Sequence, residues 1–247
     1  MKYEQHDHVG LLRMEAGKAN AMSPELIAGL DRLLDELKAA RARAAVITGY
    51  DKYFSAGLAL TEIIDFDRPR MKAFIDSFSR VMMRIFSLEI PVVAAINGHA
   101  IAGGCVLGLM ADERLMAERE VKIGLNEVQI GIGLPPIVIE PLRLQVPPTS
   151  LVPIAIEGQL LTPHEALELK LVEKLMPEND LEGFALSRAK SLCAAPPMAL
   201  AQVKRSLRGP VRERLERDLE KSDPWLDTWF SEEAQQRLRA AVAKLRG

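Results

Sequence analysis

The sequence has few of the residues that mark several classes of protein. Its 247 residues include two cysteines and four histidines, and 5% of them are aromatic. Cys105 and Cys193 alone cannot build the disulfide framework of a small secreted domain. His6 and His8 form a pair in a polar segment without further ligands, a pattern typical of solvated side chains. We therefore expect no metal site.

An excess of charge of one sign is also absent. The formal net charge is −2, and the Lys and Arg residues are spread along the chain. This distribution lacks the basic patch that is typical of nucleic-acid-binding proteins. We therefore expect no nucleic-acid partner.

Long apolar runs are equally scarce. Residues 91–111 carry no formal charge, but Pro91, Asn97, His99 and several small residues make the stretch only mildly apolar. A membrane-spanning helix needs a more strongly apolar segment of this length. The first residues, MKYEQHDH, are polar and lack the apolar segment of a secretory signal. We expect a cytoplasmic protein without a membrane partner.

The remaining composition favours an α/β protein. Apolar residues make up 48% of the chain and charged residues 27%, which suits one large domain with or without a small appendage. Apolar segments of strand length alternate with segments of helical periodicity, as they do in proteins with parallel sheets and crossover helices. The expected strands are Val9–Met14, Ala44–Thr48, Pro91–Ile96, Arg114–Ala117 and Val121–Ile123.

Helix-start signals locate the helices. Ser23 followed by Pro24 and Glu25 is typical of an N-cap and first turn, and apolar residues then recur at helical spacing up to Leu37. Thr162 and Glu165 form a capping-box pattern. Two further helices are expected, at Arg70–Leu88 and Gly103–Met110.

After about Leu181 the strand patterns stop, and the rest of the chain is helical and charged. The change predicts two parts: a core of residues 1–190 and a helical C-terminal part of residues 191–247.

Two glycine-containing segments follow buried strands. They are Phe54–Leu58 (FSAGL) and Asn97–Cys105 (NGHAIAGGC). Small residues at strand ends let a ligand approach the backbone closely, and free N–H groups at a helix start favour negative charge. If both segments met at one carbonyl oxygen, they would form an oxyanion hole. Taken singly, each segment could also be a purely structural turn.

A third segment, Ile123–Gly133 (IGLNEVQIGIG), contains one acid, Glu127, among apolar residues and glycine. Burial would raise the pKa of this carboxyl into the range of a general base. The alternatives are a solvated loop acid or a carboxylate that caps backbone N–H groups.

Together, these segments resemble the crotonase superfamily, also called the enoyl-CoA hydratase/isomerase family. The resemblance extends from Lys18–Ser23 (KANAMS) to about Pro177. It implies a spiral of ββα repeats and a helical C-terminal trimerisation region. It also implies an acyl-CoA thioester as substrate and assembly as a homotrimer or a dimer of trimers. Coenzyme A would enter as part of the substrate, and no separate cofactor is implied.

The resemblance also assigns roles to residues. The N–H groups of Leu58 and Gly103 match the family's oxyanion donors, and Glu127 matches a catalytic glutamate. Lys18 is equally well explained as a surface lysine. The residues that match the family's substrate and CoA contacts are Lys18, Ala19, Ala21, Ala56, Gly57 and Leu60.

One carboxylate, where hydratases of the family have two, favours isomerisation. The second glutamate of those hydratases lies three residues after the oxyanion glycine, where this chain has Val106. Three stretches resemble the mitochondrial-type Δ3,Δ2-enoyl-CoA isomerases of the family more closely than the two-glutamate hydratases: Ser55–Glu62 (SAGLALTE), Ala102–Cys105 (AGGC) and Ile123–Ile132 (IGLNEVQIGI). Ala59 replaces an Asp that is usual in that type, and Glu140 is a second carboxylate of unknown reach. A 2-enoyl-CoA hydratase, an acyl-CoA decarboxylase, or a thioester-binding protein without activity remain alternatives.

Several other residues fit either a functional or a packing role. His99 could touch an acyl chain or pack within its loop, and Cys105 is expected in the core because no adjacent base would activate it. The residues that could line an acyl tunnel or fill the core are Met71, Phe74, Phe78, Met82 and Met83. Those expected to serve packing or subunit contact are Trp225, Trp229 and Phe230.

Overall fold

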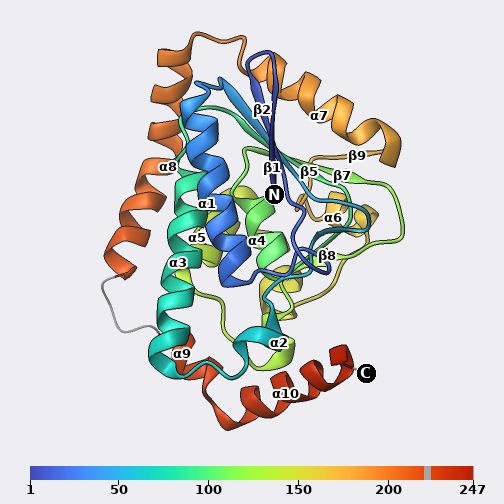
Figure 1. Ribbon diagram of the computed structural model, residues 1–247, viewed down its shortest axis with the longest axis vertical. Coiled ribbons are helices and arrows are strands. Elements are labelled where there is room, and N and C mark those ends of the chain that lie inside the picture. The colour runs from blue at the N-terminus through green and yellow to red at the C-terminus, as the bar shows by residue number, and fades with distance from the viewer. Residues whose placement is uncertain (220–223, 247) are drawn as a thin grey trace.

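Two sheets form the centre of the protein, which is described by a computed structural model over residues 1–219 and 224–246 (Figure 1). The larger sheet has the order β1-β2-β3-β5-β7-β9, and its strands are parallel except for the β1–β2 pair. The smaller sheet has the order β4-β6-β8 and is parallel throughout. The strands are β1 (Lys2–His6), β2 (Val9–Arg13), β3 (Ala44–Thr48), β4 (Tyr53–Ser55), β5 (Val92–Ile96), β6 (His99–Ile101), β7 (Glu113–Ala117), β8 (Ile123–Gly124) and β9 (Lys174–Met176).

The chain repeats one unit three times. In each unit one strand joins the large sheet, the next joins the small sheet, and a helix follows: β3–β4–α3, β5–β6–α4 and β7–β8–α5. The predicted α/β class is therefore confirmed. The α-helices are α1 (Pro24–Ala39), α2 (Leu60–Ile63), α3 (Arg68–Phe86), α4 (Gly103–Leu109), α5 (Pro136–Gln145), α6 (Pro163–Glu168), α7 (Glu178–Leu192), α8 (Pro197–Leu219), α9 (Pro224–Trp229) and α10 (Glu232–Arg246). Shorter helical turns are η1 (Glu127–Ile130), η2 (Pro148–Ser150) and η3 (Val152–Ile156).

Local sequence signals located most elements correctly. The hydroxyl of Ser23 accepts a hydrogen bond from the N–H of Leu26 at 3.1 Å, and the capping box before α6 is formed. The strand expected at Val121–Ile123 is wrong in position, because the N–H of Val121 bonds to Arg119 O in a turn and β8 begins only at Ile123. Helix α3 begins at Arg68, before the predicted range, because the side chain of Asp67 caps its first turn by accepting from the N–H of Arg70.

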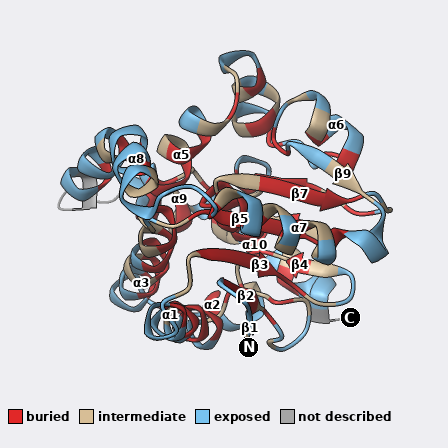
Figure 2. Cartoon of the chain, turned by 90° about the horizontal axis from the view of Figure 1, so that it is seen from above, coloured by how far each residue is buried: buried red, intermediate tan, exposed pale blue. Residues whose placement is uncertain are grey.

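Both faces of the large sheet are covered at its centre, which explains why β3 and β5 are buried along their whole length (Figure 2). Val46 and Val93 pack toward α7, while Ile47 and Ala94 belong to the main core that α1, α3 and α4 cover on the other face. Packing on both faces holds β3 and β5 in place, and with them the start of the loops that follow their carboxyl ends.

The C-terminal helices pack against the preceding core. Helix α7 lies on β2, β3, β5 and β7, so the proposed division at residue 190 falls in its last turn. Helix α8 contacts α3 and α5, and α10 contacts α2 and η1. The division into a core and an oligomerisation region stays a prediction, as does the trimer.

A buried ion cluster fastens α8 to the core. Asp112 binds Lys204 at 2.6 Å and Arg208 at 2.7 Å, and both cationic side chains are 9% exposed. Lys204 also donates to Ile90 O, and Arg208 donates to the carbonyls of Phe86 and Met110. Burial lowers the pKa of Lys204 to about 8, and the charge of Asp112 opposes that shift. The cations of α8 therefore satisfy carbonyl groups at the ends of α3 and α4.

Replacing Asp112 with Ala is expected to lower the free energy of unfolding by about 2–3 kcal/mol, because two buried cations lose their counter-charge. Chemical denaturation would measure the loss. Arg205→Met is the matched control on the same helix, since the Arg205–Glu89 pair is about half exposed on both sides and should contribute at most about 0.5 kcal/mol. Equal losses in the two variants would contradict the buried cluster's role.

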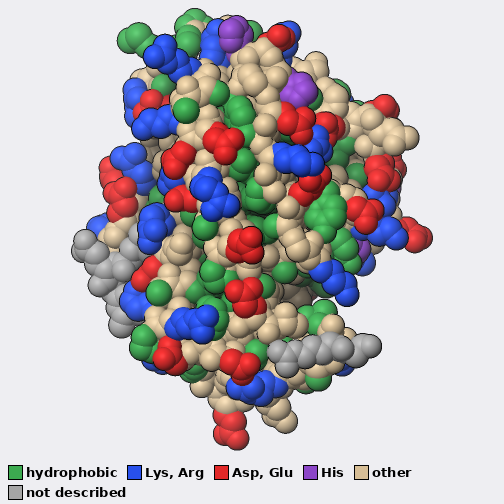
Figure 3. All heavy atoms as spheres, viewed as in Figure 1, with side chains coloured by type: hydrophobic (Ala, Val, Ile, Leu, Met, Phe, Trp, Pro, Cys, Tyr) green, Lys and Arg blue, Asp and Glu red, His purple; other side chains and the backbone are tan. Residues whose placement is uncertain are grey.

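Residues 91–111 form β5, β6 and α4 inside the core. Within residues 1–219 and 224–246, no helix combines the length and apolar character needed to cross a bilayer. On the face seen in Figure 3, Lys and Arg side chains are interspersed with Asp and Glu side chains.

Candidate active site

The first glycine segment continues from β4 and lies beside the KANAMS segment. The N–H of Met22 donates to Gly57 O at 2.7 Å, and the N–H of Ala59 donates to Met22 O at 3.1 Å. Successive backbone groups of an extended segment point in opposite directions, so the N–H of Leu58 points away from Met22. Among the described residues, none accepts a hydrogen bond from it. Leu58 thus presents a free donor.

Asn20 holds these two segments together. Its side chain is fully buried, accepts from the N–H of Ala16 at 2.9 Å and donates to Met14 O and Phe54 O. The hydroxyl of Ser55 donates to Asn20 O at 2.7 Å. Sequence reasoning missed both residues. Asn is among the few residues that tolerate the positive φ, 48°, found at position 20, but its sequence neighbours do not reveal its distant partners.

The second glycine segment turns from β6 into α4. Ala102 has a φ of 49°, and Gly103 is the first residue of the helix. The N–H of a first helical residue has no intrahelical acceptor. Gly103 therefore offers the second free donor.

The two glycine segments touch through their backbones. A Cβ atom on Gly57 would lie 2.8 Å from Ile101 O, and one on Gly104 would lie 2.3 Å from Ser55 O. Gly57 also has a φ of 87°, which side chains rarely adopt. Glycine at these two positions allows the segments of Leu58 and Gly103 to approach each other.

Glu127 begins the turn η1, three residues after β8. That strand pairs with β6, and the N–H of Ala102 donates to Gly124 O at 2.8 Å, so the acid's segment runs beside the second glycine segment. Glu127 is 8% exposed, and its Oε2 atom has no hydrogen-bond partner among the described residues. Burial raises its pKa to about 7, while its own backbone N–H acts in the opposite direction. A solvated loop acid is therefore the wrong description.

The second candidate carboxylate, Glu140, is held in ion pairs, and the Cys105 thiol is not ionised. Glu140 binds Arg214 at 2.6 Å and Arg143 at 3.5 Å, on the side of α5 that packs near α8. Val106 is buried in α4. Burial and the charge of Glu127 both raise the pKa of the Cys105 thiol, which is consequently a neutral core group, as expected.

The residues assigned to CoA by resemblance come together around the first glycine segment. Lys18 is exposed, Ala19 and Ala21 are half-buried, and the N–H of Ala56 donates to Ala19 O at 3.0 Å. Ala56 and Leu60 are half-buried and Gly57 is buried. Lys18 lies at the exposed end of this group.

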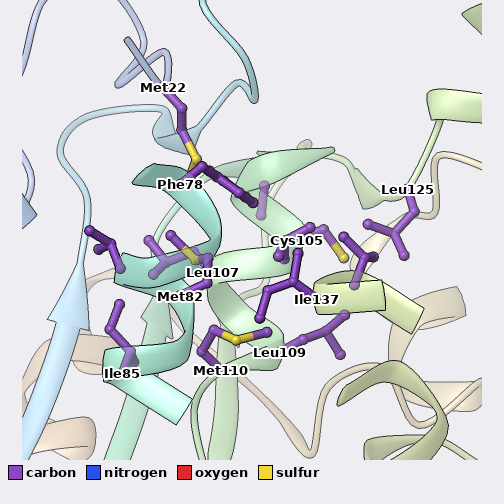
Figure 4. Packing of buried hydrophobic residues seen from close by; sticks show 14 of the residues in the cluster. Met22, Phe78, Met82, Ile85, Cys105, Leu107, Leu109, Met110, Leu125 and Ile137 are labelled. Atoms are coloured by element: carbon purple, nitrogen blue, oxygen red, sulfur yellow. The ribbon is translucent and has the colours of Figure 1, made fainter. Parts of the chain in front are cut away.

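Apolar side chains surround the second donor. A Cβ atom on Gly103 would lie 2.8 Å from the sulfur of Met22 and 3.5 Å from the ring of Phe78, and Figure 4 shows these two side chains next to each other. Met71, Phe74 and Met82 are also buried in this cluster, whereas Met83 is half-buried and lines a groove beside α8.

The remaining candidates pack. Nδ1 of His99 accepts from the N–H of Lys122 at 3.1 Å, and the ring lies 5.5 Å from that of Tyr53. Trp225 and Trp229 stack on each other, with ring centroids 5.3 Å apart, and both are buried. Phe230 is partly buried against the same core. Within the described residues, no group of three His, Cys, Asp or Glu side chains could hold a metal ion.

Comparison with known proteins identifies the family. The model of the family described as enoyl-CoA hydratase/isomerase matches residues 4–244. The chain belongs to the enoyl-CoA hydratase/isomerase family.

Members of both activities within the enoyl-CoA hydratase/isomerase family are similar to this chain. The human mitochondrial enoyl-CoA delta isomerase 1 is 29% identical over 210 residues, which are 84% of this chain and 70% of the human protein. A putative enoyl-CoA hydratase of Thermus thermophilus is 35% identical over 179 residues, 71% of this chain and 68% of that protein. The crystal structure of human mitochondrial delta3-delta2-enoyl-CoA isomerase superposes with a TM-score of 0.92 at 26% identity, over 99% of this chain and 97% of that chain. The predicted crotonase fold is thereby confirmed, and an acyl-CoA substrate is consistent with the family.

Proposed function

We propose that this protein isomerises 3-enoyl-CoA to 2-enoyl-CoA in fatty-acid or related acyl-CoA metabolism. The observation that carries the proposal is a buried carboxylate, Glu127, whose Oε2 has no partner among the described residues, in a segment that runs beside the second of two glycine segments with free N–H donors. Such an arrangement suits a reaction in which one group removes a proton and returns it, while the negative charge rests on a thioester oxygen.

In the proposed reaction Glu127 takes a proton from C2 of the 3-enoyl thioester. The electrons of that C–H bond move into the thioester, and the enolate oxygen accepts hydrogen bonds from the N–H groups of Leu58 and Gly103. The protonated Glu127 then gives the proton to C4, the double bond moves to C2–C3, and the carboxylate is restored. No water and no second acid takes part.

The absence of a second proton-transferring side chain on α4 supports isomerisation over hydration. Addition of water in this family uses two glutamates, and Val106 stands where one of them would be. Glu140 is bound by Arg214 and Arg143. Hydration or decarboxylation remains the alternative activity, since the similar proteins include a putative hydratase.

The test uses two substrates with the purified protein. A 3-enoyl-CoA should yield the absorbance of a conjugated 2-enoyl thioester, and a 2-enoyl-CoA should gain no water. Hydration of the 2-enoyl-CoA without isomerisation of the 3-enoyl-CoA would overturn the proposal. Binding of both thioesters without turnover would favour a protein that has no catalytic activity.

The pH dependence follows from the state of Glu127. The base must be ionised in the free enzyme, and burial raises its pKa to about 7. We therefore expect kcat/KM to rise with pH through about 7 and to level off above it. Initial rates measured from about pH 5.5 to about pH 9 would check this. A midpoint near the ordinary pKa of a glutamate would mean that the carboxyl is hydrated before substrate binds.

A further inference from the structure

The segment that follows Glu127 is held by the last two helices. Its alternate residues contact α9 and α10: Gln129 O accepts from Arg237 at 3.4 Å, Gly131 lies against Ala234, and the N–H of Gly133 donates to the hydroxyl of Thr228 at 3.0 Å. Helix α10 also contacts α2, which follows the first glycine segment (Figure 1). These helices thus touch both halves of the candidate site.

Gly131 packs so closely against α10 that there is no space for a side chain at this position. A Cβ atom on Gly131 would lie 3.0 Å from the backbone of Ala234, and Gly131 has a φ of 81°. Ala234 itself is fully buried. The turn η1 therefore ends directly on the surface of α10.

Thr228 joins the turn to α9 through both functions of its hydroxyl. Oγ1 donates to Trp225 O at 2.7 Å and accepts from the N–H of Gly133. The hydroxyl of Ser231 in turn donates to Thr228 O at 2.8 Å and accepts from the N–H of Ala234 at 3.2 Å. Hydrogen bonds through Ser231 thus link Ala234, which lies against Gly131, to Thr228, which binds Gly133.

The turn itself connects this anchor to the acid. Glu127 O accepts from the N–H of Ile132 at 3.0 Å, and Ile132 precedes Gly133 in the chain. The backbone of Glu127 is therefore hydrogen-bonded to Ile132, and the next residue, Gly133, is hydrogen-bonded to Thr228. Upstream, the acid's segment is fixed by the bond from Ala102 to Gly124 O.

We infer that Thr228 is a positioning residue for Glu127: its hydroxyl fixes the downstream end of the turn and so the place of the carboxylate relative to the two N–H donors. The inference rests on the proposed role of Glu127 as the proton-transferring group. Thr228 itself touches no reacting atom. Its effect is on geometry, to which proton transfer is sensitive.

The experiment compares Thr228→Val with Thr228→Ser. Valine keeps the shape and removes the hydroxyl, so we expect kcat to fall about tenfold or more while KM changes less than about twofold. Serine keeps the hydroxyl and should retain most of the activity. In the valine variant water would reach the carboxyl more easily, and the pH midpoint should move below that of the wild type, toward the ordinary value of a glutamate. Burial raises the pKa of the Cys105 thiol and the charge of Glu127 raises it further, so this thiol stays neutral over the pH range of the assay.

Arg43→Met is the matched control. Arg43 also ties the C-terminal helical part to the core, by donating to Cys193 O at 2.8 Å, but it lies at the amino end of β3, away from the loops that follow the carboxyl ends of the strands. Its kcat and pH profile should match those of the wild type. Equal losses in the Thr228→Val and Arg43→Met variants, or in the Val and Ser variants at Thr228, would overturn the positioning role.

Hydrogen exchange separates this inference from the proposed function. Amides of residues 127–133 should exchange faster in Thr228→Val than in the wild type or in Thr228→Ser. If the wild type turns over neither substrate, the proposed function fails, and faster exchange still reports that Thr228 holds the turn. If the wild type is active and Thr228→Val keeps its kcat, pH midpoint and exchange rates, the positioning role fails and the proposed function stands.

Discussion

Replacing Glu127 with Gln is expected to lower kcat for 3-enoyl-CoA isomerisation by about 10²–10⁴-fold, with KM nearly unchanged. Glutamine keeps the size and buried position of the side chain but can neither take nor return a proton. The two N–H donors of Leu58 and Gly103 would still bind the thioester oxygen. Steady-state rates from the appearance of the 2-enoyl absorbance would measure the loss. Full activity of the variant would rule out the proposed mechanism.

The same variant is expected to be more stable than the wild type above neutral pH. Glu127 has a folded-state pKa of about 7, above the ordinary value of 4.5, because burial disfavours its ionised form. Well below the ordinary pKa both the folded and unfolded states are protonated, so the ionisation penalty is absent. Between the ordinary pKa and the folded-state pKa the unfolded state ionises while the folded state stays protonated, so the wild type loses stability as pH rises until the folded state ionises too, whereas Gln does not titrate. Melting temperatures at about pH 5 and about pH 8.5 should diverge at the higher pH. Identical curves at both values would mean that the carboxyl is solvated.

Replacing Gly104 with Ala is expected to lower the free energy of unfolding by about 3 kcal/mol and kcat/KM by about 100-fold. The new Cβ atom would lie 2.3 Å from Ser55 O, a backbone atom that cannot turn aside as a flexible side chain could. The segment from Ser55 to Leu58 would have to shift, and with it one of the two N–H donors. Denaturant unfolding and the isomerase assay would measure the two effects.

Gly108→Ala is the matched control in the same helix. A Cβ atom there would meet only the end of the Ile96 side chain at 3.5 Å, an ordinary contact. Alanine is also the better helix former, by about 0.5–1 kcal/mol. The control should therefore be as stable as the wild type or more so, with normal activity. If both alanine variants behaved alike, the close approach of the two glycine segments would not be required for the site.

Features that depend on a few neighbouring residues could be predicted from the sequence. The Ser23 cap of α1, the capping box at Thr162 and the apolar strands β3 and β5 are of this kind, because each is determined by residues within one turn or one strand. The apolar surroundings of Glu127 left burial and a solvated loop both open, and the structure decides for burial. The family resemblance then supplied the spiral of repeats, which local patterns alone do not specify.

Features that depend on distant segments could not be predicted. Asn20 binds carbonyl groups before and after itself, and nothing in its neighbours identifies Phe54 as a partner. Thr228 lies 95 positions from Gly133, and a threonine in a helical segment has no distinctive pattern. The short strand β8 was misplaced because Val121 is as apolar as a strand residue, although a turn contact decides its conformation. In each case the missing information is a tertiary contact.

The attachment of the turn after Glu127 to α9 and α10 has a consequence for biosynthesis. Residues 224–246 leave the ribosome after the sheets, both glycine segments and Glu127 have already emerged. In a nascent chain whose sheets have already assembled, the turn that carries Glu127 would therefore still lack its contacts with α9 and α10. Under the proposed function, catalytic competence would arise only when α9 and α10 dock, although the two sheets could assemble before then.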